Sequence, residues 1–286
     1  MHIAIAACRT NPQLSSSNKT LKSALEACGA RVSVLNWNEH SAADFLSCDL
    51  TLLRQTWDYQ NDPGGFAAWL IRLNAMGGQI EARPDLAIWN NDKRTLIEIK
   101  GAGVEIPETY RSVEDAVASQ GDRGSTEKLV LKPAFGGDGV GVEQTCLSEI
   151  EATRTKIEQD VPGRPILVQE FLPEIDDGEW KMTCIDGKVE LTVQAKPMTG
   201  EFRINSRFGP TIAAAEPPAA ARSAAEKIMA FVGAPLCARV DGVMREDRFI
   251  CTELELCDPD LHLHYAPEVA TILAEATLRR IDAEQA

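Results

Sequence analysis

Apolar strands and amphipathic helices alternate through the first 80 residues of the chain. The predicted elements, in order, are strand 2–8, helix 17–28, strand 31–37, strand 49–53 and helix 65–76. Gly29 and Gly77 follow the two helices, as expected where a helix ends. Strands that alternate with helices usually pair in parallel, so this part is predicted to be a small parallel α/β domain.

The remainder of the chain has more strands than helices. A helix is predicted to begin at Asn91 or Asp92, either of which is a good N-cap, and to run to Lys100. The dipeptide Asp186-Gly187 is typical of a hairpin turn. The other predicted elements are strands 128–132, 166–172, 180–185 and 188–196 and helices 148–159, 219–232 and 267–281. The fold class is therefore expected to be α/β, with α+β character beyond the first domain.

Residues 237–256 read as two strands joined by a tight polar turn. Side chains alternate between the two faces of a strand. A turn centred near Asp247 places Asp241 opposite Glu253 in an antiparallel pair. The side chains predicted to share one face of this hairpin are Arg239, Asp241, Glu253 and Glu255. The opposite face of the second strand is predicted to carry Ile250, Thr252, Leu254 and Leu256.

The shared face of the hairpin brings three carboxylates and one guanidinium together. Clustered carboxylates raise one another's pKa unless a cation lies between them. Their hard oxygen atoms suit Mg²⁺, which usually takes one or two carboxylates together with phosphate oxygens. The alternative is a solvated strand face of alternating charge. The pattern predicts a magnesium site on Asp241, Glu253 and Glu255.

A glycine-rich run follows strand 128–132, which ends near Lys132. The residues of the run are Gly136, Gly137, Asp138, Gly139, Val140 and Gly141. Such a loop exposes backbone N–H groups and can approach phosphates closely. It lacks the GK[ST] of a Walker A loop, and no helix follows at once as in a dinucleotide-binding turn. The run therefore predicts a hairpin that covers a nucleotide, with a flexible surface hairpin as the alternative.

Several basic residues lie where a ligand could bind. Arg9 and Arg54 follow predicted parallel strands, whose carboxyl ends are the usual ligand side of such a sheet. Arg54 could bind a substrate carboxylate through its planar fork. It could equally pair with Asp58. Lys93 lies at the start of a predicted helix, where a positive charge is unfavourable. Its position is easier to explain if it binds an anion; the alternative is an exposed surface lysine. The other candidates for substrate contact are Arg203, Arg207, His262 and His264, although both histidines could be surface or packing residues.

Composition narrows the range of functions. The 286 residues are 44% hydrophobic and 25% charged, as in an ordinary soluble protein. A net charge of −14 argues against broad nucleic-acid binding, although local lysines can still hold a nucleotide. No signal peptide and no apolar run of membrane-spanning length is seen in the sequence. Eight scattered cysteines without a CxxC motif predict reduced thiols and a cytoplasmic protein, with metal-binding or catalytic cysteine as the alternative.

The order of the motifs resembles the ATP-grasp superfamily, in the branch of D-alanine–D-alanine ligase, bacterial glutathione synthetase and RimK-type ligases. The motifs are Lys93 at a helix start, Lys132 before a glycine loop, a QEFL strand at 169–172, Glu179 before the next strand, Arg239-x-Asp241 and Glu253-x-Glu255. The resemblance covers residues from about 88 to the C-terminus. It implies an ATP-grasp fold with a preceding α/β domain at 1–88, a central subdomain at 89–168 and a C-terminal subdomain at 169–286.

The resemblance also implies roles for the individual residues. Lys93 and Lys132 would contact phosphates, and the glycine-rich run at 136–141 would close over them. Gln169, Glu170, Phe171 and Leu172 would line the adenine, and Glu179 would hold the ribose. Asp241, Glu253 and Glu255 would hold two Mg²⁺ ions, which Mn²⁺ could replace, and Arg239 would stabilise the anionic transition state. The family often has asparagine where this chain has Glu255.

Three segments are similar to the D-cycloserine-forming ligases of this superfamily: RQTWDY, VQEFLPEIDDGEWKM and ELELCDPDLHLHYAPE. The similarity implies a small amino-acid-derived substrate, ring closure and a role in antibiotic biosynthesis. The implied reaction joins a carboxylate to an amine through an acyl phosphate. The alternatives are a small-molecule kinase and a nucleotide-binding regulatory module without turnover. The resemblance implies a homodimer, which is common in the family, and no other protein partner.

Overall fold

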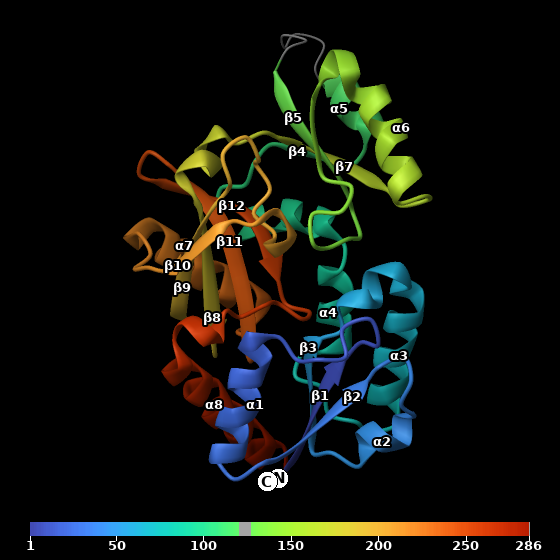
Figure 1. Ribbon diagram of the computed structural model, residues 1–286, viewed down its shortest axis with the longest axis vertical. Helices are drawn as coiled ribbons and strands as arrows, with labels where there is room; N and C mark the ends of the chain where they lie inside the picture. Colours follow the sequence, from blue (N-terminus) through green and yellow to red (C-terminus); the bar gives the residue numbers. More distant parts are fainter. Residues whose placement is uncertain (120–126, 286) are drawn as a thin grey trace.

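The computed structural model describes residues 1–119 and 127–285 and arranges them around three sheets (Figure 1). The first sheet is parallel, in the order β2 (Arg31–Asn36), β1 (His2–Ala7), β3 (Leu50–Gln55). The second is antiparallel, in the order β4 (Thr109–Tyr110), β7 (Ile166–Glu170), β5 (Lys128–Pro133), β6 (Glu143–Cys146). The third is antiparallel, in the order β10 (Thr211–Ala214), β9 (Lys188–Lys196), β8 (Glu179–Ile185), β11 (Cys237–Arg245), β12 (Arg248–Glu255). The predicted parallel N-terminal unit and the fold class are confirmed.

The N-terminal sheet is covered by helices on both sides. These helices are α1 (Ser16–Ala27), α2 (Ala42–Leu46), α3 (Pro63–Ala75) and α4 (Pro84–Asn90). Ser15 caps α1 through its side chain, which accepts from the Asn18 amide, and Gly29 follows with a positive φ. The sequence pattern missed α2 and α4, because helices of five and seven residues are too short to show a clear helical period.

The middle sheet carries α5 (Val113–Ser119) and α6 (Ile150–Asp160), which pack on one of its faces around Leu131 and Val168. Figure 1 shows this domain at the top, away from the other two sheets. Strand β7 spans the expected division at 168/169 and pairs with β5, so it belongs to the middle sheet. We therefore propose that the boundary between the middle domain and the C-terminal domain lies after Glu170.

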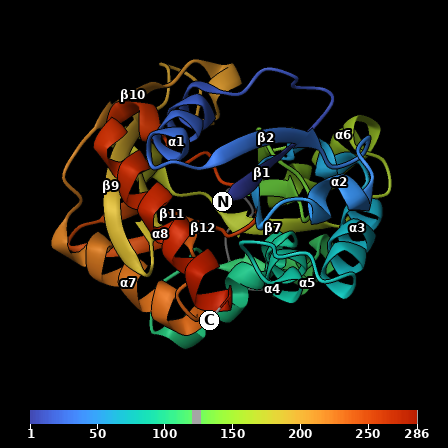
Figure 2. The ribbon, with the colours of Figure 1, turned by 90° about the horizontal axis from the view of Figure 1, so that it is seen from below.

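The C-terminal sheet shares a core with the N-terminal domain. Helix α7 (Ala219–Val232) covers one face of the sheet, and α8 (Pro267–Gln285) lies beside α1 (Figure 2). Leu25 of α1 packs in one cluster with Leu273 of α8 and Val193 of β9. The N-terminal and C-terminal domains are therefore joined by one continuous apolar core. The middle domain has an apolar cluster of its own.

The short 3-10 helices complete the chain. They are η1 (Trp57–Asn61), η2 (Lys93–Ala102), η3 (Leu147–Glu149), η4 (Pro173–Asp177), η5 (Ser206–Phe208) and η6 (Leu263–Tyr265). The helix predicted after Asn91 is therefore present, capped by Asp92, but has 3-10 geometry. No helix among the described residues is long and apolar enough to cross a membrane.

Asp241 lies opposite Glu253 in the β11–β12 hairpin, as predicted, but nearer the turn Arg245 pairs with Arg248, one residue away from the register of a turn centred at Asp247. The prediction that Ile250, Thr252, Leu254 and Leu256 share a face is wrong, because the register shifts next to Gly242. This bulge turns Thr252 toward Glu179, whereas Ile250 and Leu254 pack in different apolar clusters. A Cβ on Gly242 would lie 2.3 Å from the carbonyl oxygen of Ile250, so the bulge requires glycine.

Candidate active site

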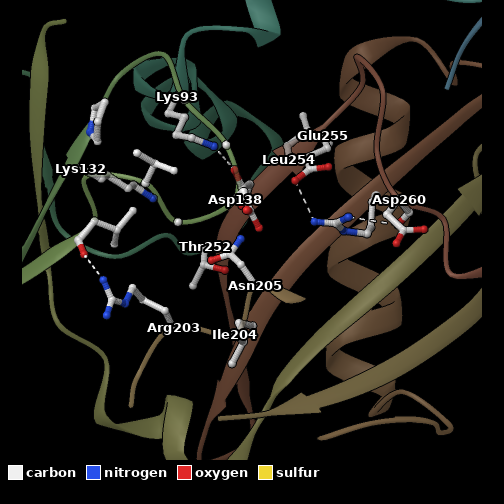
Figure 3. Close-up of a pocket in the computed structure, with 18 of the residues that line it drawn as sticks. Lys93, Lys132, Asp138, Arg203, Ile204, Asn205, Thr252, Leu254, Glu255 and Asp260 are labelled. Atoms are coloured by element: carbon white, nitrogen blue, oxygen red, sulfur yellow. Dashed lines mark hydrogen bonds and ion pairs between the residues drawn. The ribbon is translucent and has the colours of Figure 1, made fainter. Parts of the chain in front are cut away.

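A cavity of about 780 Å³ lies between the three sheets, a volume within the usual range for small-ligand sites. Most of the residues singled out in the sequence for nucleotide, metal or substrate contact line it: Lys93, Lys132, Gly136, Gly137, Asp138, Gly139, Val140, Gln169, Glu170, Phe171, Leu172, Glu179, Arg203, Arg207, Arg239, Glu253, Glu255 and His262. In Figure 3, Lys93 and Lys132 lie on one side of this cavity, and Glu255 and Asp260 lie on the other. Thr10, Asn11 and residues 57–61 of the N-terminal part also line the cavity, so the fold gathers residues from all three parts of the chain into one site.

The three carboxylates of the hairpin are close enough to share a cation. One oxygen from each of Asp241, Glu253 and Glu255 lies within 4.8 Å of the other two. Asp241 is fully buried, and the side chains of Glu253 and Glu255 are 27% and 28% exposed. The predicted clustering of these residues is therefore present.

Basic side chains surround this carboxylate cluster. Lys93 is hydrogen-bonded to Glu253. The guanidinium of Arg239 donates to both oxygens of Asp241 at 2.8 Å and to Glu255 at 2.7 Å. The carboxylate of Glu253, on the β11–β12 hairpin, is therefore the anion that explains a lysine at the start of this helix.

Burial and charge act in opposite directions on these groups. Burial opposes ionisation of Glu253, but the ammonium groups of Lys93 and Lys132 outweigh it and hold the pKa of this carboxyl at about 2. Burial raises the pKa of Glu255 to about 7, although Arg239 favours its anion. Burial also lowers the pKa of Lys132 to about 8. Lys132 is thus a desolvated cation for which an additional anion would be favourable.

The donor set of the cluster fits a divalent cation. A carboxylate offers about four lone-pair positions, and Asp241 uses three of them for Arg239 and Lys181. The ion pairs of Glu253 and Glu255 engage the Oε1 atom of each. Oxygen donors remain on all three side chains, and carboxylate oxygen is the preferred ligand of Mg²⁺. The site is thus suited to hold this ion beside a phosphate.

The glycine-rich loop is held from two sides. The Gly137 amide donates to the side chain of Gln60, which belongs to η1 in the N-terminal domain. Gly139 has a φ of +70° and lies against Asn205 and Phe208 of the loop after β9. Arg203 of that loop donates to the carbonyl oxygen of Val142 at 3.3 Å and lies 4.0 Å from the Phe208 ring. The two loops together form the cover of the cavity.

We expect Gly139→Ala to loosen this cover. A Cβ would lie 2.6 Å from Asn205 Oδ1 and 2.7 Å from Phe208 Cε2, and a positive φ costs a non-glycine residue about 1–3 kcal/mol. The loop that carries Arg203 and Arg207 should then be cleaved faster by trypsin. Gly163→Ala is the matched control, because Gly163 has a φ of +75° with no atom near its Cβ position. Equal cleavage rates for the two variants would contradict the loop contact.

The strand end at β7 forms the apolar end of the cavity. The amides of Glu170 and Phe171 already donate to the carbonyl oxygens of Glu108 and Lys128. Leu172 is therefore the best candidate of the QEFL segment for an amide that contacts a base. Gln169 donates from its side chain to Thr109 at 3.0 Å. Their contact with adenine remains a prediction.

Two of the predicted substrate residues lie outside the cavity. Arg54 is fully buried and pairs with Glu81, so it neither faces the cavity nor pairs with Asp58 as the alternative expected. Arg9 is exposed and lies 3.8 Å from Glu39. Neither side chain lies where substrate contact was expected. Strand β3 continues to Gln55, so Arg54 lies inside a buried strand, and the position of Arg9 after β1 does not fix the direction of its side chain. Arg203 and His262 line the cavity, and their contact with substrate remains a prediction.

The sequence reasoning missed Lys181, which lies between two acids. Its ammonium is 2.8 Å from both Glu179 and Asp241. Glu179 also accepts from Thr252 at 2.7 Å, so both of its oxygens are engaged, and its role toward ribose remains a prediction. The sequence contained a signal for Lys181, because residues two apart on a strand share a face and Lys181 follows Glu179 by two. In the structure Lys181 also lies opposite Asp241 of β11.

Two stretches of the chain match models of known protein families. Residues 3–81 match the N-terminal domain of D-cycloserine synthetase DcsG. Residues 106–235 match the ATP-grasp domain of prokaryotic glutathione synthetase. The chain is 27% identical over 282 residues to the cycloserine biosynthesis protein DcsG of Streptomyces lavendulae, covering 90% of this chain and 92% of that protein.

Solved structures agree with these sequence matches. A crystal structure of D-cycloserine synthetase DcsG superposes with a TM-score of 0.84 at 21% identity, over 98% of this chain and 100% of that chain. The D-alanine–D-alanine ligase of Bacillus anthracis superposes with a TM-score of 0.71 at 16% identity, over 99% of each chain. Residues 106–235 therefore resemble the ATP-grasp domain of prokaryotic glutathione synthetase, and the chain has the fold of the ATP-grasp ligases.

Proposed function

We propose that this protein is an ATP-dependent carboxylate–amine ligase that acts on a small amino-acid-derived substrate. The observation that carries the proposal is the cluster of Asp241, Glu253 and Glu255, which lies among Lys93, Lys132 and Arg239 at one cavity. The similarity to a cycloserine biosynthesis protein favours ring closure within one substrate molecule.

The nucleotide is bound between the middle and C-terminal sheets. Lys93 and Lys132 contact its phosphates, and the backbone N–H groups of the glycine-rich loop lie above them. Leu172 offers its amide to the adenine edge. The Mg²⁺ ions, two in our proposal and replaceable by Mn²⁺, would be held by Asp241, Glu253 and Glu255 and would offset the phosphate charge.

The reaction proceeds in two displacements. A carboxylate oxygen of the substrate attacks the γ-phosphorus of ATP, and ADP leaves with the electron pair of the broken P–O bond. An amine then attacks the carbonyl carbon of the acyl phosphate, loses its proton, and phosphate leaves. Lys93 and Lys132 hold the phosphoryl oxygens in line during the first step.

Arg239 is the candidate for stabilising the oxyanion of the second step. Its bonds to Asp241, Glu255 and the Asp260 carbonyl use four of the five guanidinium N–H groups. The remaining N–H group, on Nη1, can donate to a developing oxyanion. The two carboxylates fix the plane of the guanidinium, and such preorganisation is what makes electrostatic catalysis effective.

Product analysis distinguishes this proposal from the two alternatives. The purified protein is incubated with MgATP and a panel of amino acids, and ADP and free phosphate are both measured. A ligase releases the two in equal amounts, and added hydroxylamine traps the acyl phosphate as a hydroxamate. A kinase releases ADP while phosphate stays on the product. Binding of MgATP without any release would support the regulatory module.

We expect Lys132→Ala to weaken the binding of MgADP by roughly 10- to 100-fold, the loss of one charge-assisted contact of about 1.5–3 kcal/mol. Isothermal calorimetry measures this directly and needs no knowledge of the substrate. Lys156→Ala is the control, because Lys156 is exposed and pairs with Glu143 in the same domain. An unchanged affinity in Lys132→Ala would remove the phosphate role of this lysine.

A further inference from the structure

Two ion pairs hold the tip of the β11–β12 hairpin against the stretches of chain that enter and leave the middle domain. The Nη1 atom of Arg248 lies 2.9 Å from Glu105, before β4. The Nε atom of Arg245 lies 2.6 Å from Glu174, after β7. Within the described part of the chain, the apolar cluster of the middle domain has no member from the other two domains. The middle domain can therefore open and close as one body about this hairpin tip.

The N-terminal domain contacts the middle domain through η1. The side-chain oxygen of Gln60 accepts from the Gly137 amide of the glycine-rich loop. The Oδ1 atom of Asn61 accepts from Arg164 at 3.3 Å, and Arg164 also donates to the carbonyl oxygen of Phe135 at 3.1 Å. In Figure 1, β11 and β12 lie left of the centre and α3, which follows η1, lies on the right. These contacts are therefore remote from the hairpin tip.

The η1 segment is fixed to its own domain. The carboxylate of Asp58 accepts from the indole N–H of Trp37 at 2.6 Å and from Asn38 at 2.9 Å. The ring of Tyr59 stacks on that of Phe66, with 5.1 Å between the centroids. The N-terminal domain in turn shares an apolar core with the C-terminal domain. Because η1 cannot follow the middle domain, an opening movement must break the contacts between them.

Gln60 holds the glycine-rich loop without using the amides that follow Gly137. The amides of Asp138 and Gly139 have no acceptor among the residues that the structure describes, so they remain available to a phosphate. The carboxamide of glutamine accepts a hydrogen bond but carries no charge, so it does not repel phosphates as a carboxylate would. The bond involves no atom of a ligand and can therefore form with or without nucleotide.

We propose that Gln60 is a positioning residue that holds the glycine-rich loop shut over the nucleotide, with Asn61 as a second contact. The proposal rests on the nucleotide site of the proposed function. Nucleotide enters and leaves only when the middle domain opens and both contacts break. The N-terminal domain thereby sets the rate of nucleotide exchange, and in the closed position it keeps water away from the acyl phosphate.

The rates of nucleotide binding test this role. Gln60→Met keeps the length of the side chain and removes the acceptor. With fluorescent methylanthraniloyl-ADP and Mg²⁺ in a stopped-flow instrument, the association and dissociation rate constants should both rise about 3- to 10-fold, the range for one hydrogen bond. The dissociation constant should change by less than about twofold, because the bond closes the site in the free and the bound protein alike.

Hydrogen exchange tests the same contact without any nucleotide. The backbone amides of residues 134–142 should exchange faster in Gln60→Met than in wild type. Gln60→Glu retains an acceptor and should keep the slow exchange. Asn61→Ala removes an exposed and longer hydrogen bond and should have a smaller effect. Gln79→Met, at an exposed glutamine of the same domain, is the control and should match wild type in both measurements.

The outcomes separate this role from the proposed function. Unchanged rate constants in Gln60→Met, or a rise in the dissociation rate constant alone, would overturn the positioning role, since the second result would mean that Gln60 stabilises only the bound state. Equal exchange of residues 134–142 in Gln60→Met and wild type would overturn it as well. The proposed function fails separately, if the wild-type protein does not bind MgADP, and hydrogen exchange then still decides whether Gln60 holds the loop.

Discussion

Glu253→Gln is expected to lower the turnover of MgATP with substrate by at least about 100-fold, which is typical for the loss of one preorganised electrostatic group. The amide keeps the size of the side chain and removes the charge that pairs with Lys93 and lies opposite Asp241. The phosphate charge would then be offset less completely at the reacting atoms. Because the Glu253 side chain is 27% exposed, the hairpin should remain folded.

Metal affinity tests whether a weakened metal site causes this loss of turnover. Titration with Mn²⁺, followed by electron paramagnetic resonance, should show weaker binding to Glu253→Gln, and high Mg²⁺ should restore part of the turnover. Glu246→Gln, in the exposed turn of the same hairpin, is the control and should match wild type. Full activity of Glu253→Gln, or unchanged Mn²⁺ binding, would show that the carboxylate cluster is not the metal site.

The pair of Asp241 and Glu253 was predicted from a turn centred near Asp247, but the structure reaches the same pair in another way. The turn pairs Arg245 with Arg248, and regular pairing from there would place Asp241 opposite Thr252; the extra residue of β12 moves Glu253 into that position. The same rules failed for Thr252, because one extra residue in β12 reverses the faces on one side of the bulge. Gly242 was the sequence signal for that bulge, since a glycine inside a strand often marks one.

The side of the cavity that carries Lys93, Lys132 and the glycine-rich loop was easier to predict than the opposite side. These residues are set by a helix start and a strand end, so their backbone places them. The opposite side depends on which way single side chains turn in loops that pack between domains. Arg54 turns inward toward Glu81, and Asp258 reaches Thr56 across 202 residues of chain, which no local pattern reveals.

Arg54→Met is expected to lower the free energy of unfolding by about 3–5 kcal/mol, the usual cost of leaving one partner of a buried ion pair alone. Glu81 would lose its cationic partner in the interior, where its side chain is 3% exposed and also accepts from the Leu53 amide at 3.0 Å. Methionine fills most of the space of the arginine stem, so the loss would come from the charge and not from a cavity. Urea unfolding, followed by tryptophan fluorescence and by circular dichroism, measures the difference.

The double variant Arg54→Met/Glu81→Gln tests this explanation. Glutamine retains an oxygen for the Leu53 amide and carries no charge, so the double variant should recover much of the stability that Arg54→Met loses. Binding of MgADP should be close to wild type in both variants, because Arg54 does not line the cavity. If Arg54→Met is as stable as wild type and instead raises the KM for the carboxylate substrate, the arginine acts at the substrate and its burial behind Glu81 does not represent the working enzyme.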